Sequence, residues 1–281
     1  MSKTVLITGC STGLGNITAK KFAKEGWNVV ATMRNPDKSL EQENTDRIFV
    51  TQLDVTNPNS IDLAIEEGIL RFGEINAVVN NAGGGFGSIF EATPMDVIRS
   101  NFETNVFGVM NVIKAIIPHF REIGGGTIVN ISSSAGFGAP PFRPVYTATK
   151  HAVEGFSESL SYELESQKIS VKLIEPGFMP TTNFMTSTVA TQELTIPSSY
   201  QSYFETIMSG MSNSQEEFTD VNQVANQIYI AACDESDRLR YPVGPDSEAL
   251  SNLRWSTSEE VYLEAAREIM GHLAWRKTQE N

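Results

Sequence analysis

The chain has 281 residues, 40% of them apolar and 20% charged, which excludes a disordered or fibrous protein and allows one large α/β domain or two small ones. Its 34 acidic and 21 basic side chains give a net charge of −13, which argues against nucleic acid and anionic membrane surfaces as partners. Cys10 and Cys233 are too few for a disulfide framework or a zinc site. With no apolar run of about 18 residues, we expect a soluble cytoplasmic protein without a metal.

Short β-branched runs alternate with segments of helical periodicity along the chain. We expect strands at residues 4–8, 28–33, 48–53, 76–79, 127–131, 170–174 and 240–243, and helices at 14–25, 59–72, 95–122, 145–167, 220–233 and 258–275. Strands that are apolar throughout, separated by helices, predict a doubly wound parallel sheet of about seven strands with helices on both faces. With no linker or repeat, we expect residues 1–281 to form one domain. It would carry a strand-free lid at about 177–219 and a C-terminal helical extension at about 246–281.

A glycine-rich turn follows the first strand, with the sequence TGCSTGLG at residues 8–15. Glycines between a strand and a helix let backbone N–H groups and the positive end of the helix approach a pyrophosphate. The spacing Gly-x-x-x-Gly-x-Gly could also form an ordinary tight turn, but its place after the first strand favours a nucleotide site. The candidate phosphate-binding residues are Gly9, Ser11, Thr12, Gly13, Leu14 and Gly15.

The end of the second strand indicates which nucleotide is preferred. An acidic residue at this position holds the 2′-hydroxyl of NAD, whereas an arginine accommodates the 2′-phosphate of NADP. The strand ends in Met33-Arg34, and the nearest acid, Asp37, lies beyond Pro36. Arg34 could be an ordinary surface cation, but its position favours NADP(H).

Hydroxyl and amino groups that suit proton transfer follow the fifth strand. Tyr146 and Lys150 are four residues apart, which places phenol and ammonium on one face of the predicted helix. A nearby cation favours the phenolate and lowers the pKa of a tyrosine. Ser133 lies thirteen residues before Tyr146, at the carboxyl end of a central strand, where open α/β sheets bind ligands.

In these motifs and their order the chain resembles the short-chain dehydrogenase/reductase family over nearly all of residues 3–245, and the resemblance implies a Rossmann-type fold. The glycine turn comes first, followed by Asp54 after the third strand, the Asn80-Asn81-Ala82-Gly83 segment after the fourth, and Asn105 in the helix before the fifth. Ser133, the Tyr146/Lys150 pair and Pro176-Gly177 with Thr181 complete the set.

The resemblance implies a role for each matching residue. Tyr146 would exchange a proton with the substrate oxygen, and Ser133 would hydrogen-bond that oxygen. Lys150 would hold the nicotinamide ribose and lower the pKa of Tyr146, while Asn105 would support a water that relays protons to Lys150. The remaining cofactor-binding residues would be Asp54 at the adenine, Asn81, Ala82 and Gly83 at the adenosine ribose, Thr181 at the carboxamide, and Val55, Pro176 and Gly177 nearby.

Large apolar side chains indicate the substrate class. Phe178, Met179, Phe184, Met185, Tyr200, Tyr203, Phe204, Met208 and Met211 crowd the strand-free stretch, and Phe137, Pro140, Pro141 and Phe142 lie between Ser133 and Tyr146. Long loops in compact domains are often lids or binding loops, although these side chains could also close a small secondary core. We therefore expect a small apolar or aromatic carbonyl compound or alcohol as substrate. Arg143, the exception in this wall, could meet a carboxylate.

The sequence thus predicts an NADP(H)-dependent oxidoreductase that interconverts a ketone or aldehyde and its alcohol. The alternatives are a catalytically silent NADP-binding sensor or scaffold, or a family member that performs dehydration or isomerisation. Helices near 101–122 and 149–167 could pair in a homodimer.

Overall fold

The structure is a computed structural model that describes residues 2–43, 46–85, 87–180, 196–212 and 218–280. Its centre is a seven-stranded parallel sheet in the order β3-β2-β1-β4-β5-β6-β7. The strands are β1 (Thr4–Ile7), β2 (Asn28–Met33), β3 (Ile48–Gln52), β4 (Ala77–Asn80), β5 (Gly126–Ile131), β6 (Ile169–Pro176) and β7 (Arg240–Val243). The predicted α/β fold and its seven strands are confirmed.

Helices cover both faces of the sheet, and further helices extend beyond its carboxyl edge. They are α1 (Gly13–Lys24), α2 (Ser39–Glu43), α3 (Pro58–Phe72), α4 (Met95–Phe102), α5 (Gly108–Glu122), α6 (Pro144–Glu165), α7 (Gln201–Ser212), α8 (Val221–Cys233), α9 (Pro245–Ser256), α10 (Glu259–Ile269) and α11 (His272–Gln279). Short helical turns are η1 (Phe90–Ala92), η2 (Glu103–Phe107), η3 (Ser134–Gly136) and η5 (Ser198–Tyr200).

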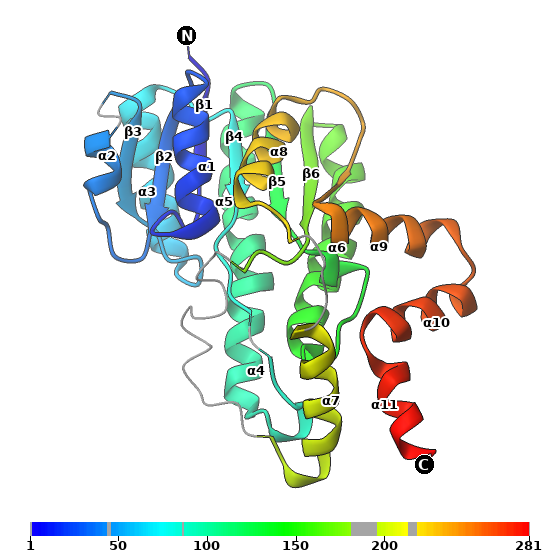
Figure 1. The fold of residues 1–281 in the computed structure, drawn as a ribbon. Coiled ribbons are helices and arrows are strands. Elements are labelled where there is room, and N and C mark those ends of the chain that lie inside the picture. Colours follow the sequence, from blue (N-terminus) through cyan, green and yellow to red (C-terminus); the bar gives the residue numbers. More distant parts are fainter. Residues whose placement is uncertain (1, 44–45, 86, 181–195, 213–217, 281) are drawn as a thin grey trace.

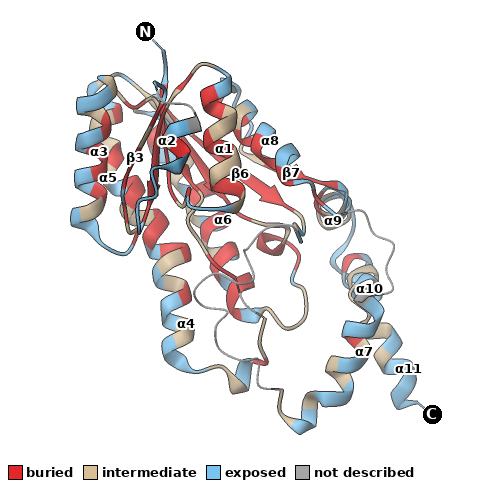
Figure 2. Cartoon of the chain, turned by 60° about the vertical axis from the view of Figure 1, so that its left-hand side comes forward, coloured by how far each residue is buried: buried red, intermediate tan, exposed pale blue. Residues whose placement is uncertain are grey.

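The apolar strands form two cores because successive side chains point to opposite faces of the sheet. Val5 and Ile7 belong to the core under α1 and α8, whereas Leu6, between them, belongs to the core under α3 and α5. The strands are therefore buried on both sides (Figure 2), as continuous apolar runs predict.

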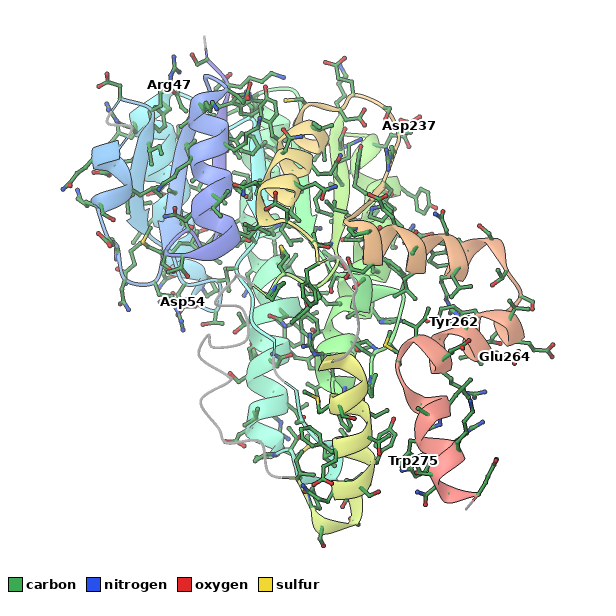
Figure 3. The ribbon with its side chains drawn as sticks, viewed as in Figure 1. Arg47, Asp54, Asp237, Tyr262, Glu264 and Trp275 are labelled. Atoms are coloured by element: carbon green, nitrogen blue, oxygen red, sulfur yellow. The ribbon has the colours of Figure 1, made fainter. Side chains whose placement is uncertain are left out.

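All seven strands end at one edge of the sheet, since they are parallel. Arg47 and Asp54 mark the two ends of β3, with Asp54 at the carboxyl edge (Figure 3). The lower part of α4, with α7, α10 and α11, projects beyond this edge (Figure 1). The carboxyl edge thus has a further layer of helices beside it.

Helices α2 and α7 form in segments where no helix was expected, and two of the expected helices are interrupted. The helix expected at 95–122 contains a π-helical turn, η2, between α4 and α5. The helix expected at 258–275 is two helices, because Gly271 has a positive φ of 74° between α10 and α11. Helical periodicity alone shows neither change.

Candidate active site

The glycine-rich turn joins β1 to α1 with little room for side chains. Gly9 has a φ of +74°, and a Cβ added to Gly15 would lie 2.2 Å from the Gly9 carbonyl oxygen. Thr12 caps α1 without a side-chain hydrogen bond, and Ser11 and Thr12 are exposed, whereas Leu14 is buried. This cradle of backbone at a helix N-terminus has the shape and charge that suit a phosphate group.

Asn81 braces this turn from the end of β4. Its Nδ2 donates hydrogen bonds to the carbonyl oxygens of Thr8 and Gly9, at 2.8 and 3.1 Å. The backbone N–H groups of Asn81 and Ala82 donate to the Thr8 hydroxyl, at 3.0 and 2.9 Å. The Asn81 amide therefore holds the two strand ends together, a role that the sequence analysis did not foresee.

The residues expected around the adenosine also lie at the carboxyl edge. Arg34 is exposed directly after β2, where its carbonyl oxygen accepts a hydrogen bond from Gln52 at 3.1 Å. Asp54 follows β3, and its Oδ1 accepts from the N–H and hydroxyl of Thr56 at 2.9 and 2.8 Å. Val55 is buried, and its carbonyl accepts from Asn111 at 3.1 Å. The ends of the neighbouring strands β2 and β3 thus bring Arg34 and Asp54, which are 20 positions apart, to the same edge of the sheet.

Ser133 and Tyr146 meet between β5 and α6. Tyr146 is only 4% exposed, and its phenol and the Ser133 hydroxyl are hydrogen-bonded. Burial raises the pKa of Tyr146 to about 12, while the Ser133 hydrogen bond and the Arg143 guanidinium act in the lowering direction. The expected lowering of this pKa is therefore wrong for the chain alone, because the cost of burying a phenolate is the largest effect.

Lys150 lies one turn further along α6 and is 7% exposed. Its Nζ is 5.7 Å from the centre of the Tyr146 ring and donates a hydrogen bond to the Ile131 carbonyl at 2.8 Å. Burial lowers the pKa of Lys150 to about 8, whereas the charge of Glu154 raises it. Phenol and ammonium share one face, as their spacing predicts, but the ammonium is held against the end of β5.

Asn105 lies in the π-helical turn and is buried. Its Oδ1 accepts from the Gly84 N–H at 3.0 Å, and its Nδ2 donates to the Gly84 carbonyl at 2.8 Å and to Thr149 Oγ1 at 3.2 Å. The Thr149 hydroxyl in turn donates to the Tyr146 carbonyl at 2.7 Å. Asn105 therefore ties the segment after β4, including Gly83, to the first turns of α6. A role in supporting a water stays a prediction.

The segment after β6 is fixed by a residue that the sequence analysis missed. Pro176 ends β6, and the Gly177 N–H donates to the Val243 carbonyl at 3.0 Å. Asp246, in the first turn of α9, accepts from the Phe178 N–H at 2.7 Å and from the Thr219 hydroxyl at 2.7 Å. This one carboxylate holds both ends of the strand-free stretch. In the sequence, the only local indication of this role is an acidic residue directly after Pro245.

Aromatic side chains form the wall beyond Ser133 and Tyr146. The Phe142 ring lies 5.4 Å from that of Tyr203 and 5.1 Å from that of Phe204, both on α7. Phe178 packs edge-on against Phe218 at 5.6 Å, and the Arg143 guanidinium lies 5.6 Å from the Phe178 ring. Thr181, Phe184 and Met185, with the rest of residues 181–195, lie outside the described residues, as does the side chain of Met211.

Two kinds of feature are missing from the described residues. No helix among them is long and apolar enough to cross a membrane. The same residues contain no group of three or more His, Cys, Asp or Glu side chains placed to hold a metal ion.

A parallel sheet with a glycine turn after β1 and a Ser-Tyr-Lys group at the same edge defines a Rossmann-type oxidoreductase that uses a nicotinamide cofactor. Comparison with known proteins agrees, since the family model described as "short chain dehydrogenase" matches residues 3–193. The chain therefore belongs to the short-chain dehydrogenase/reductase family of oxidoreductases.

Relatives and solved structures are similar over most of the chain. Uncharacterized oxidoreductase YusZ of Bacillus subtilis is 38% identical over 86% of this chain and 89% of its own. The 3-ketodihydrosphingosine reductase of Bacteroides thetaiotaomicron is 39% identical over 62% of each chain. ElxO with NADP bound is 26% identical, covers 85% of this chain and 97% of its own, and has a TM-score of 0.71. A Burkholderia phymatum family member in complex with NAD has 24% identity over 91% of this chain and 93% of its own, with a TM-score of 0.74.

Proposed function

We propose that the protein is an NADP(H)-dependent oxidoreductase that interconverts a ketone or aldehyde and the corresponding alcohol on an apolar or aromatic substrate. The observation that carries this proposal is the buried hydrogen bond between Ser133 and Tyr146 at the sheet edge where the glycine turn opens. A pKa of about 12 keeps Tyr146 protonated at neutral pH, so that it can donate a proton.

The residues present suit this chemistry. With its pyrophosphate held at the glycine turn, a reduced nicotinamide cofactor would supply a hydride to the carbonyl carbon. Tyr146 gives its proton to the carbonyl oxygen, and Ser133 donates a hydrogen bond to the same oxygen as negative charge develops there. The Lys150 ammonium, on the same helix face, favours the phenolate that remains.

Arg34 supports NADP(H) as the cofactor. It directly follows β2, and Asp37, the next acid, is exposed beyond Pro36. The NADP-bound structure of ElxO is consistent with this choice, and the NAD complex of the Burkholderia protein shows that the fold also accommodates NAD. The NADP preference therefore rests on Arg34.

The aromatic wall supports an apolar substrate. Phe142 lies on the segment between Ser133 and Tyr146, and its ring packs against those of Tyr203 and Phe204 on α7. A keto lipid, the class that the name of the Bacteroides reductase indicates, fits this chemistry.

We also propose that the chain acts as one domain and pairs in a homodimer through α5 and α6, where Tyr162 is 71% exposed.

The test is NADPH oxidation, followed by absorbance, against a panel of ketones and aldehydes of increasing size. Tyr146→Phe should still bind NADPH while turnover falls by roughly 10²- to 10⁴-fold, the usual contribution of a positioned proton donor. Near-normal turnover in this variant would contradict the mechanism. A wild-type protein that binds NADPH without turnover on the panel would instead favour the sensor.

A further inference from the structure

A cluster of carboxyl groups lies behind Lys150, on the side away from Tyr146 along α6. Arg240 of β7 is its centre, with its Nε 3.1 Å from Glu154 Oε2 and 3.6 Å from Glu175 Oε1. Its Nη2 is 2.6 Å from Glu158 Oε2. Glu154 and Glu175 are buried, whereas the Glu158 side chain is 47% exposed. One guanidinium thus faces three carboxyl groups.

The charges of this cluster do not balance if every carboxyl group is ionised. Glu154 and Glu175 approach the same nitrogen of Arg240, so their carboxyl groups are neighbours. Glu154 Oε1 and Glu175 Oε1 are buried and have no hydrogen-bond partner among the described residues. Two buried carboxylates that approach the same nitrogen repel each other, and one proton bound between them removes this repulsion.

Glu154 also faces Lys150. The two residues are four positions apart on α6 and therefore lie on one helix face. The charge of Glu154 raises the pKa of Lys150 against the effect of burial. Burial raises the pKa of Glu154, and the Ser132 hydroxyl, Arg240 and Lys150 oppose this rise. Burial and Glu154 raise the pKa of Glu175 to about 8, and Arg240 and Arg238 oppose this rise.

Water can reach this pair from the side of α9. A cavity of about 180 Å³ is lined by Glu154 and Arg240 and by Phe137, His151 and Arg254. Its charged and polar lining suits water molecules. Protons can therefore exchange between the solvent and Glu154 without passing the substrate wall.

We propose that Glu154 and Glu175 share one proton and act as the positioning pair that keeps the Lys150 ammonium charged, exchanging that proton through the cavity. With the proton on Glu175, the negative charge of Glu154 is directed at Lys150. When Tyr146 gives its O–H proton to the substrate oxygen, an N–H proton of Lys150 passes to the phenolate, the carboxyl pair returns a proton to Lys150, and water restores the proton of the pair. The inference rests on the proposed function, since Lys150 acts there beside Tyr146.

The first test compares pH profiles of Glu154→Gln and Glu158→Gln. Glu154→Gln removes the charge next to Lys150, so the alkaline limb of turnover and of NADPH affinity should move to lower pH by about one unit or more. Glu158→Gln removes another partner of Arg240, one turn further from Lys150, and should leave both limbs in place. An unmoved limb in a folded Glu154→Gln protein, as judged by circular dichroism, would overturn the inference.

The second test needs no turnover. Infrared spectra of the wild-type protein at neutral pH should contain the band of a buried protonated carboxyl group, which titrates away near pH 8 and is missing in Glu175→Gln. Absence of this band from the wild type, or its persistence in Glu175→Gln, would overturn the inference even if Glu154→Gln did not fold. A protein with this band but no turnover on any carbonyl compound would refute the proposed function alone.

Discussion

Arg34 is the residue on which the cofactor preference depends. Arg34→Glu should place a carboxylate beside the 2′-phosphate, and this repulsion costs several kcal/mol, so NADPH use should fall roughly a hundredfold or more relative to NADH. Met33 is the less suitable position for this change, because its side chain is buried in the core under α1. The measurement is kcat/KM for each cofactor.

Arg47 provides the matched control for this substitution. It lies at the opposite end of β3 from Asp54 (Figure 3), so Arg47→Glu makes the same change of charge far from the carboxyl edge. The ratio of the two cofactors should stay as in the wild type. Equal kcat/KM values for NADH and NADPH in the wild-type protein would show that Arg34 does not select for the 2′-phosphate.

The sequence predicted which residues meet at the site better than it predicted their environment. Ser133, Tyr146 and Lys150 lie close together because each follows a strand end or occupies one helix face, and both patterns are local. The pKa of Tyr146 depends on burial by distant segments. The hydrogen bond from Asn81 to Thr8 spans 73 residues, and that from the Phe178 N–H to Asp246 spans 68. No local pattern contains such contacts.

At the scale of elements, the π-helical turn shows the same limit. Residues 95–122 keep one helical periodicity, and a single widened turn changes it little. This turn nevertheless places Asn105 against Gly84 and Thr149. The strands and long helices could be predicted because their apolar spacing repeats, whereas a local widening depends on what packs against it.

Helix α11 is expected to control the position of α7. Trp275 lies between the two helices (Figure 3), with its ring 5.1 Å from that of Tyr203, which also contacts Phe142. Trp275→Ala removes the aromatic pair between α11 and α7, worth about 0.5–1.5 kcal/mol, together with a stacked contact to His272 of its own helix, so KM for bulky apolar substrates should rise about 2- to 10-fold. Small substrates, which contact less of the wall, should be affected less.

The measurement is KM across a series of ketones of increasing size. Trp255→Ala, at a tryptophan that is 62% exposed on α9 and lines the cavity beside Glu154, is the control for loss of an indole ring and should leave the dependence of KM on ketone size unchanged. Equal changes for small and bulky ketones in Trp275→Ala would contradict a role of α11 in the substrate wall.

For the whole molecule, Glu175 makes stability depend on pH. Its carboxyl group keeps its proton up to about pH 8 in the folded chain but ionises near its ordinary pKa of 4.5 when unfolded. Because the folded-state pKa is the higher one, the stability this group contributes is lost as pH rises from about 4.5 to about 8. Glu175→Gln cannot ionise. The free energy of unfolding of this variant should therefore increase relative to that of the wild type as pH rises across this range.

Urea unfolding of both proteins at several pH values between 5 and 8 measures this difference. Glu158→Gln, at a half-exposed carboxyl group in the same cluster, is the control and should follow the wild type more closely. A constant difference between Glu175→Gln and the wild type over this range would show that Glu175 ionises normally in the folded protein.

The strand order also bears on how the chain is synthesised. The first three strands form one side of the sheet, β4 pairs with β1, and from β5 onward each new strand pairs with the one made before it, ending with β7 beside β6. The sheet can therefore grow along one edge as the chain leaves the ribosome, without rearranging strands already paired. Before β7 is made, that edge is β6, whose backbone groups pair with β7 in the finished sheet and until then can pair with other chains. A ribosome that stalls before residue 240 would thus release a chain prone to aggregate, with the whole glycine turn and Tyr146 already in place.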